Sequence, residues 1–168
     1  ARPSAGNEGR PLALKLAEAV LATHTKLVAD GPTVVMRVGE SSQIELAITL
    51  QPGHCYGAYA AGGAAAISCL TDAPFFQGSL EYLRRIREAV ALPLLRKEFM
   101  LDPYQVWEAR AAGADAILLI AGFVDNSLLA DIRAVARAAG LDVLVEILEA
   151  DELDAALALD PDVLGINN

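Results

Sequence analysis

The stretch Leu94-Leu95-Arg96-Lys97-Glu98-Phe99 is a short apolar run that ends in a lysine flanked by charged residues. A buried strand has no structural need for a cation at its end, so Lys97 is a candidate functional residue. Two later apolar runs end in the same way, at Glu146 and at Asn167. Because (β/α) proteins place their active sites where the carboxyl ends of parallel strands meet, we expect these three side chains to lie close together.

Runs of Val, Ile and Leu alternate along the chain with longer segments of helical periodicity, which is typical of an α/β fold with a parallel sheet. The sequence predicts six strands, near residues 33–38, 64–70, 93–99, 114–120, 142–147 and 162–167. It predicts helices near residues 79–90, after Asp102, over 126–139 and over 150–159. An amphipathic segment, residues 11–28, precedes the first strand and is predicted to form an extra N-terminal helix.

The spacing of the strands favours one architecture. Strand centres at Ile67, Leu95, Leu118, Val145 and Ile166 are separated by just over twenty to just under thirty residues. Units of this size suit a (β/α)8 barrel of the TIM-barrel type, in which about 250 residues make eight units. A doubly wound sheet would fit the alternation equally well, but no Gly-x-Gly-x-x-Gly follows a predicted strand to support its dinucleotide-binding variant. The sequence therefore indicates either an open six-stranded sheet or a barrel without its last two units.

Composition and charge restrict the classes of function. The chain has 168 residues, 54% of them hydrophobic, and a formal net charge of -9. Nucleic acids and anionic membrane surfaces would favour clustered Lys and Arg, so neither is expected as a partner. The longest apolar runs, such as residues 116–124, are far shorter than the roughly 18 residues that span a bilayer. The first ten residues contain no apolar signal region, and we expect a cytoplasmic protein.

Cysteine and histidine give no sign of a metal centre. Cys55 and Cys69 are the only cysteines, and they lack Cys-x-x-Cys spacing, so buried free thiols are expected rather than a disulfide framework. His24 and His54 lie apart from any cluster of carboxylates or cysteines, so no metal site is expected.

Several motifs follow one another from about Pro52 to the end of the chain. They are AAISCLTD at 65–72, FFQGSL at 75–80, LRKEF at 95–99, DPYQ at 102–105, ARAAGADAILLI at 109–120, LVE at 144–146 and GINN at 165–168. Through these motifs the sequence resembles the indole-3-glycerol phosphate synthase family of (β/α) barrels. The resemblance implies a carboxy-lyase of tryptophan biosynthesis. Its substrate would be the phosphosugar 1-(2-carboxyphenylamino)-1-deoxyribulose 5-phosphate, which it converts to indole-3-glycerol phosphate with loss of CO2 and water and without any cofactor.

Carried over position by position, the resemblance implies a role for each lead candidate. Lys97 would act as general acid toward the substrate carbonyl, Glu146 would assist the later dehydration, and Asn167 would hydrogen-bond substrate hydroxyls. Negative charge builds on the carbonyl oxygen during ring closure, and a positioned ammonium can both stabilise that charge and deliver a proton. The side chains that would line the pocket for the aromatic ring are Phe76, Phe99 and Leu118.

The first predicted strand departs from the family pattern, in which Glu-x-Lys is followed by Ser-Pro-Ser. In the ungapped frame, Val35 takes the glutamate position, Arg37 the lysine position and Ser42 the position of the second serine. A shift of one residue would put Met36 and Val38 at the first two positions, so the acidic residue is absent in either frame. Arg37 and Ser42 remain candidates for substrate binding, although arginine is a poor proton donor.

Strands seven and eight of the family, whose loops hold the substrate phosphate, have no counterpart in this sequence. We therefore expect residues 1–168 to form a single barrel domain that is incomplete at its C-terminus. Its first and sixth strands would be open edges, through which two copies could self-associate. A carboxy-lyase is the leading hypothesis, and a non-catalytic relative that acts as a binding or interaction module is the alternative. Another phosphosugar barrel, such as the preceding isomerase, fits the three polar candidates less well.

Overall fold

The structure is a computed structural model, and it describes residues 23–26, 33–38, 46–49, 60, 64 and 66–167. Within these residues, eight strands form one sheet in the order of the sequence. Its carboxyl-terminal part consists of five parallel strands, namely β4 (Ala66–Leu70), β5 (Leu94–Lys97), β6 (Ala116–Ile120), β7 (Asp142–Ile147) and β8 (Val163–Ile166). A helix follows each of the first four of these strands, so the α/β architecture predicted from the sequence is confirmed.

The other three strands extend the sheet beyond β4. They are β3 (Leu46–Thr49), which pairs with β4 in parallel, and then β2 (Thr33–Val38) and β1 (Thr23–Lys26), which add antiparallel pairs. The strand predicted at residues 33–38 is present with those bounds, but the prediction that it opens the parallel sheet is wrong. Only residues 39–45 separate β2 from β3, and parallel neighbours need a crossover of about a dozen residues or more. The parallel order begins instead at β3, which is absent from the strands predicted from the sequence.

The extra helix predicted over residues 11–28 is wrong at its carboxyl end, because Thr23–Lys26 forms β1. Two of these four residues are threonine, whose branched side chain fits the pleated surface of a strand better than the crowded surface of a helix. The remainder of the predicted helix, residues 11–22 and 27–28, lies outside the described residues.

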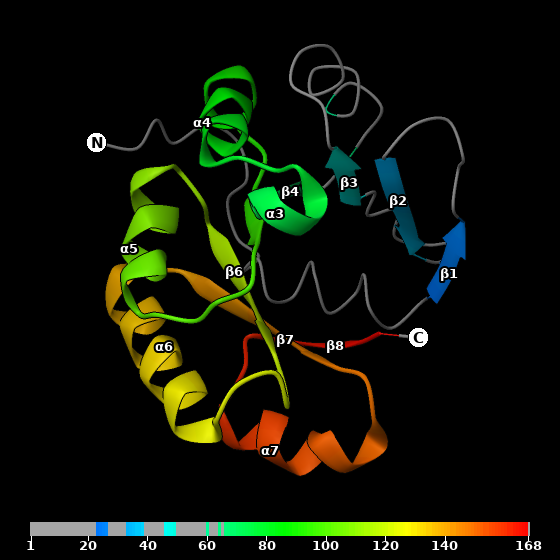
Figure 1. Cartoon of the computed structure of the whole chain (residues 1–168). Helices are drawn as coiled ribbons and strands as arrows, with labels where there is room; N and C mark the ends of the chain where they lie inside the picture. The colour runs from blue at the N-terminus through cyan, green and yellow to red at the C-terminus, as the bar shows by residue number, and fades with distance from the viewer. Residues whose placement is uncertain are drawn as a thin grey trace.

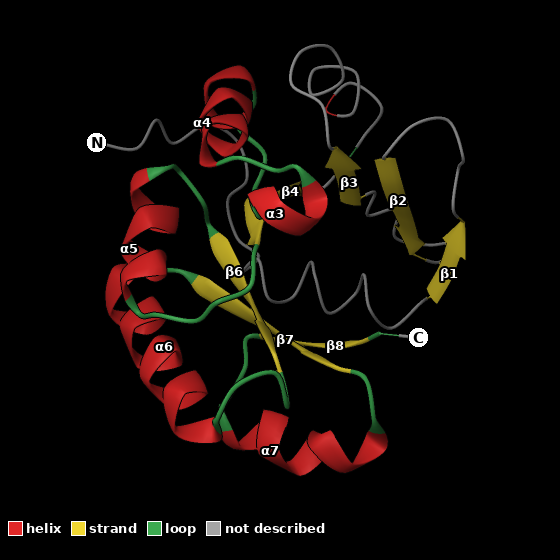
Figure 2. Cartoon of the chain, viewed as in Figure 1, coloured by secondary structure: helices red, strands yellow, loops and turns green. Residues whose placement is uncertain are grey.

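Helices α4 (Leu80–Ala89), α5 (Tyr104–Ala111), α6 (Asn126–Ala139) and α7 (Leu153–Ala158) cover the outside of the parallel sheet (Figure 1, Figure 2). The 3-10 turn η1 (Ala150–Glu152) precedes α7, and the short helix α3 (Ala73–Phe76) lies instead between the end of β4 and α4. Ser79 caps α4 by accepting a hydrogen bond from the Glu81 N–H, and Gly140 ends α6 with φ 68°. None of the described helices is long and apolar enough to cross a membrane.

The core lies between the parallel sheet and these helices. One face of the strands contributes Ile67, Leu94, Ile117, Leu119, Val143 and Val145, which pack against helical side chains such as Leu83, Ile86, Leu129 and Ile132. Each such side chain contributes about 1.5 to 3 kcal/mol through the removal of apolar surface from water. Because side chains alternate along a strand, the neighbouring positions face the other side of the sheet. That second face carries the candidate site.

Candidate active site

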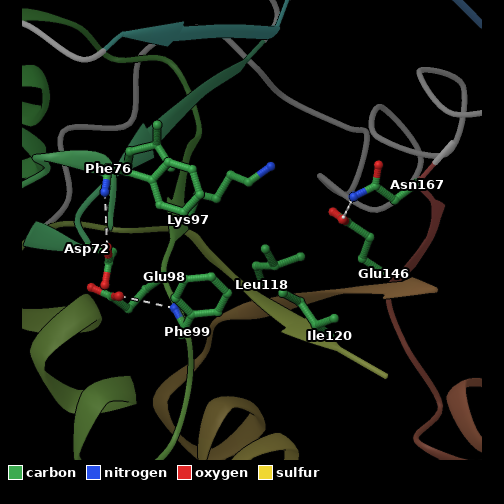
Figure 3. A pocket seen from close by; sticks show the side chains of 10 residues that line it. Asp72, Phe76, Lys97, Glu98, Phe99, Leu118, Ile120, Glu146 and Asn167 are labelled. Atoms are coloured by element: carbon green, nitrogen blue, oxygen red, sulfur yellow. Dashed lines mark hydrogen bonds between the residues drawn. The ribbon is translucent and has the colours of Figure 1, made fainter. Parts of the chain in front are cut away.

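The structure brings Lys97, Glu146 and Asn167 together around one cavity of about 180 Å³ (Figure 3). Lys97 ends β5, Glu146 lies near the end of β7, and Asn167 follows β8. All three occupy alternate positions that face away from the helices, so the parallel register collects them at the carboxyl edge of the sheet. The amino end of Lys97 points across the cavity toward the side where Glu146 and Asn167 lie (Figure 3).

Aromatic and aliphatic side chains form the opposite wall of the cavity. Phe76, Phe99 and Leu118, the predicted ring-binding residues, all line it. The ring centroids of Phe76 and Phe99 are 6.1 Å apart, and Phe99 stacks on Phe123 at 4.9 Å. A flat apolar group could therefore lie against this wall while its polar substituents face Lys97 and Glu146.

Four further residues line the same cavity and were not among the predicted site residues. They are Leu70, Asp72, Glu98 and Ile120. Leu70 is paired with Lys97 and Ile120 with Glu146 in the strand register, so the alternation of the strands could have identified both. Asp72 and Glu98 lie beyond strand ends, where the sequence carries no signal for the direction of a side chain.

The short helix α3 places Phe76 at the cavity. Oδ1 of Asp72 accepts hydrogen bonds from the N–H groups of Phe75 at 2.8 Å and Phe76 at 3.2 Å, which caps the helix. Gly78 then allows the chain to pass close to β4, because a Cβ atom added there would lie 2.4 Å from the Leu70 carbonyl oxygen. The cap at Asp72 and the close approach at Gly78 therefore hold the Phe-Phe-Gln-Gly segment against the end of β4.

The side chains of Glu146 and Asn167 are joined directly. Nδ2 of Asn167 donates a hydrogen bond to Oε1 of Glu146 at 2.6 Å, and the Asn167 N–H donates to the Ile147 carbonyl at 2.8 Å. Asn167 is thus held at both its backbone and its side chain. Oε1 of Glu146 is therefore directed toward Asn167.

A family model matches this chain over residues 15–168, and its description is indole-3-glycerol phosphate synthase. The chain belongs to the indole-3-glycerol phosphate synthase family. Its curated relatives include the indole-3-glycerol phosphate synthase of Leptothrix cholodnii, 48% identical over 149 residues, which cover 88% of this chain and 57% of the relative. The protein of the same name from Desulfosudis oleivorans is 45% identical over 159 residues, covering 95% of this chain and 59% of the relative. The chain thus spans less than two thirds of the length of these relatives.

A solved structure supports the fold independently. The crystal structure of 3-hexulose-6-phosphate synthase superimposes with a TM-score of 0.55 over 67% of this chain and 57% of that chain, at 16% sequence identity. At this identity the likeness shows the fold alone. It agrees with an incomplete barrel of the type predicted from the strand spacing.

Arg37 and Ser42, the two predicted substrate-binding residues outside the cavity lining, have side chains that lie outside the described residues. Arg37 lies on β2, whose backbone pairs it with His24. Within the described part of the chain, no group of three or more His, Cys, Asp or Glu side chains could hold a metal ion.

Cys69 lies behind the cavity, among the core residues between β4 and the helices. Burial raises the pKa of its thiol to about 12, against a smaller opposing effect of Arg96. This thiol therefore stays protonated at neutral pH and does not serve as a nucleophile.

Proposed function

We propose that this chain carries the catalytic face of an indole-3-glycerol phosphate synthase, a carbon-carbon lyase of tryptophan biosynthesis. It would close the indole ring of 1-(2-carboxyphenylamino)-1-deoxyribulose 5-phosphate with loss of CO2 and water. One observation carries this proposal: Lys97, Glu146 and Asn167 converge on a cavity whose other wall is aromatic. Membership of the family supports it.

In the proposed reaction, a carbon of the aromatic ring attacks the substrate carbonyl carbon, and Lys97 donates a proton to the oxygen as it becomes a hydroxyl. The bond to the ring carboxylate then breaks, CO2 leaves, and its electron pair restores the aromatic ring. Glu146 assists the loss of the hydroxyl as water, and Asn167 orients Glu146 and the substrate hydroxyls. A preorganised ammonium and carboxylate in a partly apolar cavity favour these charge movements more than water does.

The wall formed by Phe76, Phe99 and Leu118 suits the anthranilate ring of this substrate, because aromatic rings stack and meet edge-to-face at such distances. In the same proposal Arg37 and Ser42 bind the substrate carboxylate or phosphate. The reaction needs no cofactor, and the phosphosugar is its small-molecule partner. We also propose that residues 1–168 belong to one barrel domain of a cytoplasmic enzyme with no nucleic-acid or membrane partner.

An assay of two forms of the protein tests this function. The first is the chain itself, and the second is a chimera extended at its C-terminus by the remaining part of the Leptothrix cholodnii relative. Both are mixed with authentic substrate, and product is followed by indole fluorescence. We expect the chimera to turn over and its Lys97→Met variant, which removes the proton donor, to be inactive. A folded chimera that binds the substrate without turnover would instead support the non-catalytic alternative and point to the altered first strand.

A further inference from the structure

Thr71, the residue after β4, connects three consecutive residues at the end of β5. Its backbone N–H donates a hydrogen bond to the Lys97 carbonyl at 3.1 Å. Its Oγ1 donates to Oε2 of Glu98 at 2.7 Å and accepts from Nε of Arg96 at 3.0 Å. Thr71 does not line the cavity, and 5% of its surface is exposed. One small side chain therefore holds the residues on both sides of Lys97.

Arg96 carries this network to α5. It is 3% exposed, and its NH1 atom donates to the Gln105 carbonyl at 2.8 Å and lies 3.5 Å from Oε2 of Glu108. Its NH2 atom lies 3.3 Å from Oε2 of Glu98. A buried arginine destabilises a fold unless its donors are paired in good geometry, so these contacts leave the guanidinium few alternative positions.

Glu98 and Gln105 hold the backbone of Phe99 by hydrogen bonds. Oε1 of Glu98 accepts a hydrogen bond from the Phe99 N–H at 3.1 Å, and Nε2 of Gln105 donates to the Phe99 carbonyl at 3.0 Å. Although Glu98 borders the cavity, its two oxygens are occupied by Thr71, Arg96 and the Phe99 backbone. Its carboxylate therefore acts as an anchor of the strand end.

We propose that Thr71 is a positioning residue, which sets the direction in which Lys97 enters the cavity by holding Arg96 and Glu98. Because side chains alternate along a strand, anchoring residues 96 and 98 fixes the backbone from which the Lys97 side chain projects. The effect of Thr71 on turnover rests on the proposed function, whereas its effect on the direction of Lys97 does not. Small displacements matter, since a misplacement of roughly 1 Å can lower a rate about a hundredfold.

The test compares three variants in the same protein. Thr71→Val keeps the shape and the backbone N–H but removes the hydroxyl, and Thr71→Ser restores a hydroxyl at the same place. Ser68→Ala is the matched control, because Ser68 is a fully buried residue on β4, three positions before Thr71, and its Oγ has no hydrogen-bond partner among the described residues. If Thr71→Val does not fold, Thr71→Ala takes its place, since it also removes the hydroxyl and leaves the neighbouring side chains more room.

The first readout does not need activity. The chain contains three lysines, Lys15, Lys26 and Lys97, so 13C-dimethylation gives a simple NMR spectrum in which Lys97→Met assigns the Lys97 signal. We expect this signal to move and sharpen in Thr71→Val, and to stay at the parent position in Thr71→Ser and Ser68→Ala. An unchanged Lys97 signal in folded Thr71→Val overturns the proposal, whether or not the protein is an enzyme.

The second readout applies to the active form. We expect kcat of Thr71→Val to fall by about tenfold to a hundredfold. Affinity for a substrate analogue with its ketone reduced to an alcohol should stay within about twofold, and Thr71→Ser should recover most of the rate. Normal kcat with only a lowered Tm would overturn the proposal, because it would make Thr71 a residue of stability alone. No turnover in the parent together with a displaced Lys97 signal in Thr71→Val would refute the proposed function and leave the positioning role standing.

Discussion

Asn167 donates a hydrogen bond from its side-chain amide to Oε1 of Glu146 at 2.6 Å, and this bond joins the ends of β7 and β8 at the cavity. Replacing Asn167 by Asp puts a second carboxylate at that distance. Like charges at this separation repel, and Glu146 also loses its hydrogen-bond donor. We expect kcat to fall further in Asn167→Asp than in Asn167→Ala, which removes the donor without adding a charge. Equal kcat values for the two variants would contradict this contact.

Asp142 provides a test of stability against pH. Burial raises the pKa of its carboxyl, the nearby Asp162 and Asp115 raise it further, and Arg133 opposes them. A raised pKa in the folded state means that ionisation of Asp142 weakens the fold as pH rises from the ordinary pKa of an aspartate, 3.8, through the folded pKa. Asp142→Asn should therefore raise Tm at pH 7 and give no gain at pH 3. The exposed Asp131→Asn on α6 is the control, and equal gains in both variants would contradict the assignment.

Cys69 should be almost inert in the folded protein. Its thiol is buried and its pKa is raised to about 12, so very little thiolate forms at pH 8. In a Cys55→Ser background, alkylation by iodoacetamide should be at least about a hundredfold slower than for an unfolded-chain thiol with a pKa near 8.5. Addition of guanidinium chloride should restore the fast rate. Fast labelling under native conditions would contradict the burial of Cys69 between β4 and the helices.

Gly78 should not tolerate a side chain. A Cβ atom added there would meet backbone atoms of Leu70 and Thr71, the nearest at 2.4 Å, and the chain would have to shift. We expect Gly78→Ala to lower the free energy of unfolding by about 1 to 3 kcal/mol, the usual range for overpacking. Gly140→Ala is the comparison variant. Gly140 has φ +68° and no atom within 4 Å of an added Cβ, so this variant measures the cost of backbone strain without crowding. Chemical denaturation measures the stability of both variants. An unchanged stability of Gly78→Ala would contradict the close approach of Gly78 to the backbone at the end of β4.

The free side of β8 is expected to promote self-association. Among the described strands β8 pairs only with β7, and Ile166 on it is 68% exposed. Exposed strand edges pair readily with other chains, and a charge on the edge prevents this. We expect light scattering to detect dimers or larger species of the chain and a shift toward monomer in Ile166→Lys. A monodisperse monomer of 17.6 kDa in the parent chain would contradict the prediction.

The sequence predicts the parallel part of the fold well because its signals are local. The helix over residues 126–139 has the predicted bounds, since periodicity and Gly140 define it without reference to the rest of the chain. The strand at residues 33–38 is also present, but alternation says nothing about direction, and its short connection to β3 makes it antiparallel. Local patterns therefore predict elements more reliably than they predict pairing.

In the candidate site too, some features could be predicted from the sequence and others could not. Lys97, Glu146 and Asn167 are strand-end residues, so counting along parallel strands is enough to bring them together. The contact of Arg96 with Thr71 joins two strand ends that are distant in the sequence, and its contact with Gln105 depends on how α5 packs on the sheet. From the sequence, the position of Arg96 inside an apolar run predicts that its charge is paired, but it does not predict which residues pair with it.

Phe99 lines two neighbouring cavities. Besides the cavity that holds Lys97, it borders a second one of about 520 Å³, which Phe75, Leu101 and Phe123 also line. Asp72 and Glu98 also line both cavities, and neither belongs to the three polar candidates. Under the proposed function, the ring of Phe99 would limit the size of the ring substituents that fit beside Lys97, and residue 99 is where we would begin to widen the range of accepted compounds.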